Sequence, residues 1–121
     1  MSEKPTSETV ECYRQAEQLK EEGDLEGAAK KLQEVLEIDP QHVLAHLTLA
    51  HIYSRTGEHA KAVEHGEKAC EFEPDDAINF TALSVTYQRA FAGTQNMDFI
   101  RKAEDAMARA QAIQGTHARH H

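Results

Sequence analysis

The amino-acid sequence of this chain repeats with a period of 34 residues. Gly23, a suitable end for one helix, is followed five places later by Ala28, and the same pair recurs as Gly57 and Ala62. Large apolar, small and proline positions repeat at this interval too. They are Leu19 and Tyr53, Val35 and Ala69, Ile38 and Phe72, and Pro40 and Pro74. A fixed period of this length predicts a repeat protein whose units stack on one another.

Each unit carries the signals of two helices. In the first unit, apolar residues recur at three-residue steps from Glu8 to Glu22, which indicates an amphipathic helix. Gly23 should end this helix, because the left-handed conformation at a helix C-terminus is cheapest for glycine. Asp24 is suited to cap the next helix. Pro40 should close the unit, since the residue before a proline disfavours helix.

The third unit departs from the period. Tyr53 and Tyr87 are 34 residues apart, but the counterpart of Ala62 is Ala103, at an offset of 41. Seven residues are therefore inserted between Tyr87 and Ala103, about two helical turns. The role of this insertion stays open at this point.

The insertion sets the expected bounds of the last helices. We expect the first helix of the third unit to reach about Ala92, with a turn at 93–96 in which Asn96 caps the last helix. That helix should span roughly 97–114, end at Gly115 and leave a C-terminal tail at 115–121. Residues 1–8 should form an N-terminal tail.

Composition and charge exclude several classes of protein. The formal net charge is −8, and an acidic chain argues against nucleic-acid binding, which requires a basic patch. No apolar run approaches the roughly 18 residues of a membrane span, and the polar start has no signal-peptide pattern. Cys12 and Cys70 lack metal-like spacing, and free thiols fit a reducing compartment. These observations predict a cytoplasmic protein.

The repeated positions resemble those of the tetratricopeptide repeat family. Small residues stand where its helices cross, an aromatic or large apolar residue follows, and proline ends a repeat. The small residues are Ala16, Ala50, Ser84, Ala28, Ala62 and Ala103. The resemblance implies an all-α fold, a right-handed α-solenoid of three antiparallel helix pairs. It places a single domain at 9–114, with repeats at about 9–42, 43–76 and 77–114.

The chain also departs from the family pattern. The usual tryptophan place holds Cys12, His46 and Phe80, and the third repeat lacks its glycine and terminal proline. No further capping helix is expected after the last repeat. Gly66 stands in mid-helix, where glycine costs about 0.5–1 kcal/mol relative to alanine. We expect it to permit close approach of a bulky neighbour such as Phe80 or Tyr87.

No motif for catalysis is visible in the sequence. It has no phosphate-binding loop, nucleophile elbow or metalloprotease His-Glu pair, so we expect neither enzymatic activity nor a cofactor. His42 and His46 are four residues apart on one expected helix, a spacing that can chelate a transition metal. His46 occupies a packing place, however, and no further ligand is evident. We therefore expect no metal site.

The family resemblance implies that a protein or peptide partner binds the concave surface formed by the first helix of each repeat. The candidate partner-binding residues are Val10, Tyr13, Arg14, Leu44, Leu47, His51, Arg55, Ile78, Val85 and Arg89. One class of the family grips a chaperone carboxylate with Lys, Asn, Asn, Lys and Arg. Those places here hold Tyr13, Glu17, Thr48, Ile78 and Ala82. The carboxylate clamp is therefore absent.

The last helix suggests an alternative function. Terminal repeats normally present a polar outer face, but this helix carries a strip of alanine, methionine and isoleucine. An uncovered apolar strip would favour a homo-oligomer. The candidate self-association residues are Ala106, Met107, Ala110 and Ile113. The sequence thus predicts a peptide-binding scaffold or, alternatively, a self-associating structural module.

Overall fold

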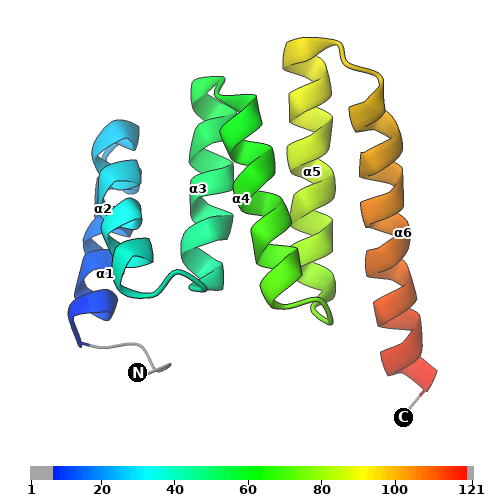
Figure 1. Ribbon diagram of the computed structural model, residues 1–121, viewed down its shortest axis with the longest axis horizontal. Helices are drawn as coiled ribbons and strands as arrows, with labels where there is room; N and C mark the ends of the chain where they lie inside the picture. The colour runs from blue at the N-terminus through cyan, green and yellow to red at the C-terminus, as the bar shows by residue number, and fades with distance from the viewer. Residues whose placement is uncertain (1–6, 120–121) are drawn as a thin grey trace.

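The computed structural model describes residues 7–119, with side chains to residue 116, and this part of the chain contains six helices and no strand. The helices follow one another in a row in chain order (Figure 1). They are α1 Ser7–Glu21, α2 Leu25–Ile38, α3 Val43–Thr56, α4 His59–Phe72, α5 Ala77–Thr94 and α6 Asp98–Arg119. The prediction of an all-α solenoid is confirmed.

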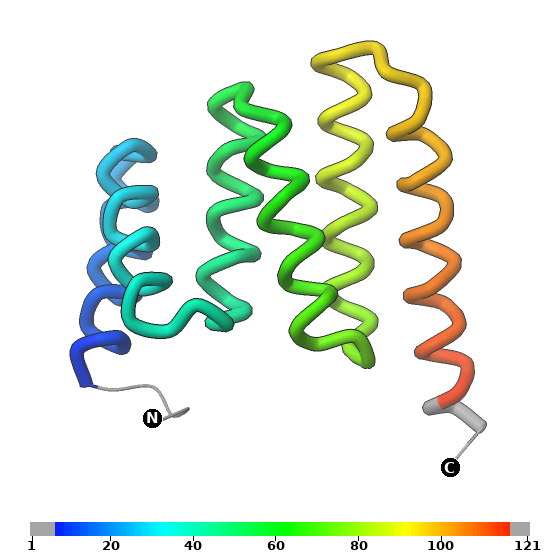
Figure 2. Tube along the Cα trace, in the orientation of Figure 1, coloured from blue at the N-terminus to red at the C-terminus, as the bar shows by residue number. Residues whose placement is uncertain are grey.

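Consecutive helices run in alternating directions and form three antiparallel pairs (Figure 2). The closest contacts are within the pairs α1–α2, α3–α4 and α5–α6, and smaller contacts join one pair to the next. Alanines at the crossings are fully buried, as at Ala16, Ala28 and Ala62. Small side chains let the helix backbones approach closely, which explains why the core needs few aromatic residues.

Backbone conformation confirms the predicted helix ends of the first two repeats. Gly23 and Gly57 adopt left-handed conformations, with φ of 90° and 84°. The Oδ1 of Asp24 accepts a hydrogen bond from the backbone N–H of Gly27 at 2.9 Å, so Asp24 caps α2 as expected. These signals fix the lengths of the helices and therefore the stacking period.

The inserted residues in the third repeat are shared between helices and loop. Relative to the second repeat, α5 is four residues longer, the loop is one residue longer, and α6 begins two residues earlier. Asn96 caps α6 as predicted, because its Oδ1 accepts from the backbone N–H of Asp98 at 3.0 Å. The predicted end of α5 at Ala92 was wrong: α5 continues to Thr94, and Gln95 takes the left-handed conformation with φ of 63°.

Gly93 lies inside α5 rather than in the turn. A Cβ atom at Gly93 would overlap the Nε2 of His59 at the start of α4, so glycine lets the His59 ring approach this helix closely and a larger residue would displace the ring. The bulky neighbour expected at Gly66 was also wrong. Its nearest neighbour is the Cδ1 of Leu83, which would lie 3.1 Å from an added Cβ, and not Phe80 or Tyr87.

The predicted stop at Gly115 was wrong. The last helix runs through Gly115 to Arg119, and the Thr116 hydroxyl donates to the carbonyl O of Ala112 at 3.0 Å. Glycine lowers helix propensity by about 1 kcal/mol but does not break a helix unless it turns left-handed. At the other end, α1 begins at Ser7, inside the predicted tail 1–8. The remainder of both predicted tails, 1–6 and 120–121, lies outside the described residues.

Equivalent hydrogen bonds join successive repeats. Gln33 in α2 donates through Nε2 to the hydroxyl O of Tyr53 at 2.9 Å, and one repeat later the Tyr87 hydroxyl donates to the Glu67 carboxylate at 2.5 Å. Burial and the bond to Glu67 raise the pKa of Tyr87. These tyrosine contacts fix how one pair sits on the next.

The face that each first helix turns toward the preceding pair changes character along the chain. In α3 and α5 this face is buried, and at the equivalent positions of α1 it is polar. The three sets are Ala45, Leu49 and Ile52; Asn79, Leu83 and Thr86; and Glu11, Gln15 and Gln18. A polar α1 face is suited to water, whereas the other two are suited to packing.

Candidate partner-binding surface

Three exposed aliphatic side chains occupy equivalent places near the starts of α1, α3 and α5. Val10, Leu44 and Ile78 are each 34 residues apart, and their side chains are 58%, 56% and 72% exposed. We call the surface formed by α1, α3 and α5 the A-helix surface. Single exposed apolar residues are ordinary, but a row repeated in every unit is not scattered. This row contributes little to the core and is available for contact.

A cavity of about 220 Å³ opens between α3 and α5 on the A-helix surface. Four of the predicted partner-binding residues line it together, Leu47, His51, Val85 and Arg89. Gly66 of α4 also lines it. Leu47 and Val85 give this cavity an apolar wall, and the titratable His51 and the cationic Arg89 lie at one end of it.

A second, shallower groove of about 400 Å³ lies at the other end of the same helices. Leu44 and Leu47 of α3 and Ile78 of α5 line it, together with three acidic residues, Asp39, Glu73 and Asp76. Leu47 lines both cavities, so the two form a continuous path along α3. The structure thus brings together six of the predicted residues from two adjacent repeats.

Two predicted residues on α1 are engaged within the chain. The Tyr13 hydroxyl lies 3.1 Å from the Oγ1 of Thr48, and its ring stacks on His42. Burial raises the pKa of Tyr13, although the bond to Thr48 acts in the opposite sense. Arg14 forms an ion pair with Glu11 one turn earlier at 2.5 Å. Neither residue lines the two cavities.

The end of the A-helix surface near the C-termini of its helices is cationic. Burial and the positive charges of Lys20, Arg55 and Arg89 lower the pKa of His51. Each of these cations comes from a different first helix, α1, α3 or α5. Arg55 and Arg89 were among the concave-surface residues that the family resemblance implied. Lys20 was not among them, and it stands one place out of the 34-residue register of the two arginines.

Ser54 lines the cavity of about 220 Å³ but was not among the predicted residues. Its hydroxyl O is buried and has no hydrogen-bond partner among the described residues. Nothing in the sequence distinguishes it from an ordinary helix serine.

His42 and His46, whose spacing could chelate a metal, both make hydrogen-bond contacts within the chain. The Nδ1 of His42 accepts from the backbone N–H of Ala45 at 3.1 Å. His46 places Nε2 2.9 Å from the carbonyl O of Pro40 and Nδ1 2.9 Å from the Nδ1 of His65. Across the residues the structure describes, no group of three His, Cys, Asp or Glu side chains is placed to hold a metal.

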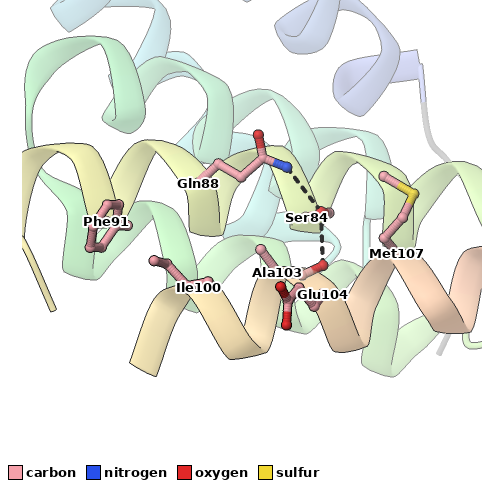
Figure 3. A pocket seen from close by; sticks show the side chains of 7 residues that line it. All are labelled: Ser84, Gln88, Phe91, Ile100, Ala103, Glu104 and Met107. Atoms are coloured by element: carbon pink, nitrogen blue, oxygen red, sulfur yellow. Dashed lines mark hydrogen bonds between the residues drawn. The ribbon is translucent and has the colours of Figure 1, made fainter. Parts of the chain in front are cut away.

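A separate open cavity of about 310 Å³ lies between the last pair of helices. Phe91 and Ile100 line one end and Met107 the other (Figure 3). At its centre Ser84 donates to the carbonyl O of Ala103 at 2.9 Å and accepts from Gln88 at 3.3 Å.

Most of the predicted self-association strip is covered by the chain itself. Ala106, Ala110 and Ile113 are only 6%, 2% and 7% exposed, whereas Met107 is partly exposed and lines the C-terminal cavity. The apolar surface available at this end therefore comes from Met107 with Phe91 and Ile100.

The sequence profile of the tetratricopeptide repeat family matches residues 11–83, more than half of the chain. The chain belongs to the tetratricopeptide repeat family. Members of this family are in general protein-interaction modules without enzymatic activity, and membership supports that role here.

Similar proteins agree with this assignment. A curated protein described as Protein CTR9 homolog, from Arabidopsis thaliana, is 34% identical over 61 residues, which are 50% of this chain and 6% of that protein. Two crystal structures of MamA have TM-scores of 0.78 and 0.67, both at 18% identity. They cover 92% and 86% of this chain, and 61% and 57% of the MamA chains. At this identity they show the fold alone, and the chain spans less than two thirds of either.

Among the described helices none combines the length and apolar character that crossing a membrane requires.

Proposed function

We propose that this tetratricopeptide repeat domain binds a partner peptide in an extended conformation along the A-helix surface. The observation that carries the proposal is the repeated exposed row of Val10, Leu44 and Ile78 beside the cavity between α3 and α5. Covering exposed aliphatic side chains with a partner contributes about 25 cal/mol of binding free energy per Å² of apolar area buried. A peptide with apolar side chains would therefore bind with a favourable hydrophobic contribution.

The helix spacing limits what peptide can use this row. The helices α3 and α5 are in contact, and packed helices lie about 8–10 Å apart. Three residues of an extended chain span about 10 Å. A peptide lying across the repeats in the polyproline II conformation, which has three residues per turn and a rise of about 3.1 Å per residue, would place every third side chain over a member of the row. The partner should therefore be extended and carry apolar residues about three positions apart.

Selection from a phage-displayed library of random short peptides tests this proposal. Selected peptides are titrated by fluorescence anisotropy against the wild type and the variants Ile78→Asp and Val85→Asp. Because both side chains are exposed, these variants should fold, which circular dichroism checks. We expect affinity to fall by about tenfold or more, equivalent to about 1.4 kcal/mol.

Met97→Asp is the matched control. Met97 is 67% exposed and lies in the loop between α5 and α6, outside both grooves. It should leave peptide affinity unchanged. The proposal is rejected if the library yields no binder, or if the selected peptides bind the two groove variants as tightly as the wild type.

Self-association is a second candidate function, favoured by the apolar cavity between α5 and α6. The partner would be a second copy of this chain, and the α5–α6 surfaces of the two copies would meet about a two-fold axis. Head-to-tail stacking is disfavoured, because the outer face of α1 presents Glu11, Gln15 and Gln18 and would leave an apolar cavity against polar groups. The contact would rest on Phe91, Ile100 and Met107.

Light scattering over a concentration series tests this second candidate. The wild type should increase in mass with concentration, and Met107→Glu should remain monomeric. Met97→Glu, an equal change outside the cavity, should behave like the wild type. A wild-type chain that stays monomeric at millimolar concentration would rule out self-association.

A further inference from the structure

We propose that the A-helix surface recognises an acidic side chain of its partner peptide, held by Arg55 and Arg89 beside His51. This inference rests on the proposed peptide-binding function and specifies the chemistry of the ligand. The ligand group is the carboxylate of an aspartate or glutamate within the peptide. The site lies at the end of the A-helix surface opposite the exposed row Val10, Leu44 and Ile78.

The first support is the arrangement of positive charge. Lys20, Arg55 and Arg89 come from three successive repeats and all act on the same imidazole, His51. Lys20 is partly neutralised by Glu17, 3.4 Å away. Within the part of the chain that the structure describes, neither Arg55 nor Arg89 takes part in an ion pair.

Unpaired arginines are notable on a chain of this charge. The formal net charge is −8, and acidic residues outnumber Lys and Arg by 21 to 13, so partners for these two arginines are abundant elsewhere on the chain. Arginine presents a planar fork of N–H donors that matches a carboxylate in two parallel hydrogen bonds. Two such forks on the neighbouring helices α3 and α5, both close enough to act on His51, offer donors that no ion pair uses within the described residues.

The second support is that the cationic end belongs to a cavity. His51 and Arg89 line the cavity of about 220 Å³ together with Leu47 and Val85. The same wall therefore offers apolar contact and charge to one ligand. Ser54 adds a hydroxyl that has no partner among the described residues.

Helix geometry gives the spacing that the peptide must have. Leu44 and His51 are seven residues apart on α3, about 10 Å at a rise of 1.5 Å per residue. Leu44 and Arg55 are eleven residues apart, about 16 Å. An extended peptide covers these lengths in about three to five residues. A peptide that turns from the row at Leu44 and continues along α3 should thus carry its acidic residue three to five places from the apolar residue over Leu44.

This site differs from the carboxylate clamp of the family in place and in residues. The clamp positions hold Tyr13, Glu17, Thr48, Ile78 and Ala82, which offer no cation. The site proposed here uses the later turns of α3 and α5. Its ligand needs no free chain terminus.

A charge-swap experiment tests the inference. The probes are fluorescein-labelled, acetylated and amidated peptides with one leucine and one glutamate three, four or five places away, in both orders. Each has a partner peptide with glutamine in place of glutamate. Affinities are measured for the wild type, for the double variant Arg55→Glu, Arg89→Glu, and for Arg101→Glu, an exposed arginine on α6.

We expect at least one glutamate peptide to bind the wild type about tenfold more tightly than its glutamine partner. The double variant should abolish this preference, and Arg101→Glu should keep it. Raising the salt concentration should weaken the preference, because exposed charges are screened. Equal binding of glutamate and glutamine peptides would overturn the inference. Tighter binding of a phosphoserine or free-carboxyl-terminal probe than of every glutamate peptide would also overturn it.

Failure of the inference can be told from failure of the proposed function. If peptides bind and Val85→Asp removes binding, but glutamate and glutamine are equivalent, the groove binds peptides without an anion site. If no leucine-containing peptide binds at all, and the random library also fails, the proposed function itself is wrong.

Discussion

The paired imidazoles of His46 and His65 predict that the fold loses stability as the pH falls below 7. The Nε2 of His46 lies 2.9 Å from the carbonyl O of Pro40, an acceptor, so this nitrogen carries the proton. Its Nδ1 then accepts from the Nδ1–H of His65 at 2.9 Å. The pair can take up one further proton at most, because two fully protonated rings would set two N–H groups against each other. Protonation of both rings in acid is therefore incompatible with this contact.

Burial, and then the proximity of His46, lower the pKa of His65 to about 4. Lys68 and Lys61 act in the same direction, and Glu64 opposes them. The unfolded value is about 6.5, so the unfolded chain binds more protons between pH 4 and 6.5, and acid favours unfolding. From pH 7 to pH 5 this one group lowers the free energy of unfolding by about 2 kcal/mol. Partial exposure reduces this to about 1–2 kcal/mol.

Urea denaturation followed by circular dichroism at pH 7 and pH 5 measures this loss. The comparison variant is His65→Gln, whose side-chain amide can donate to the Nδ1 of His46 but does not titrate. Its stability should fall by about 1–2 kcal/mol less than that of the wild type over the same interval. An NMR titration of the histidine ring protons gives the pKa of His65 directly. A value near 6.5, or equal losses in both proteins, would refute the reasoning.

Three further predictions concern stability, each measured by urea denaturation at pH 7. Gly57→Ala should lower the free energy of unfolding by about 1–2 kcal/mol, because Gly57 has a left-handed backbone conformation. Gly115→Ala inside α6 should not lower it, and equal effects of the two substitutions would contradict this. Ser84→Ala should cost about 1 kcal/mol through its bond to the Ala103 carbonyl, and Ser54→Ala, which removes an unpaired hydroxyl, should be neutral or stabilising. Tyr87→Phe should cost about 0.5–1.5 kcal/mol through the lost bond to Glu67, because that carboxylate is exposed and water can replace the donor, and an unchanged midpoint would exclude that contribution.

The helix pairs could be predicted because their signals are local. Gly23 and Gly57 mark left-handed residues, and Asp24 caps the helix that follows. The ends of α5 and α6 were predicted less well because glycine was taken as a stop at Gly93 and Gly115. Glycine also serves close approach, as Gly93 does against His59, and this use depends on a contact distant in sequence.

The candidate site was predictable where it followed the repeat. Val10, Leu44 and Ile78 share one phase of the period, and all three are exposed as a groove residue must be. Tyr13 and Lys20 show what periodicity leaves out. Tyr13 turns to Thr48 and His42, and Lys20 approaches His51 from another repeat. Such contacts depend on how one helix pair stacks on the next.

Two rows of equivalent positions on the first helices differ in how apolar character relates to burial, and this difference supports the proposed function. In the row that packs on the preceding pair, the buried positions of α3 are all apolar and the buried positions of α5 include Leu83, whereas the equivalent positions of α1 are polar. Apolar character in this row therefore accompanies burial, with Asn79 and Thr86 of α5 as polar exceptions. In the second row, aliphatic residues persist in all three helices although all three are exposed. Its members are Val10, Leu44 and Ile78. Because the fold gains little from them, their apolar character is best explained by a partner that covers them.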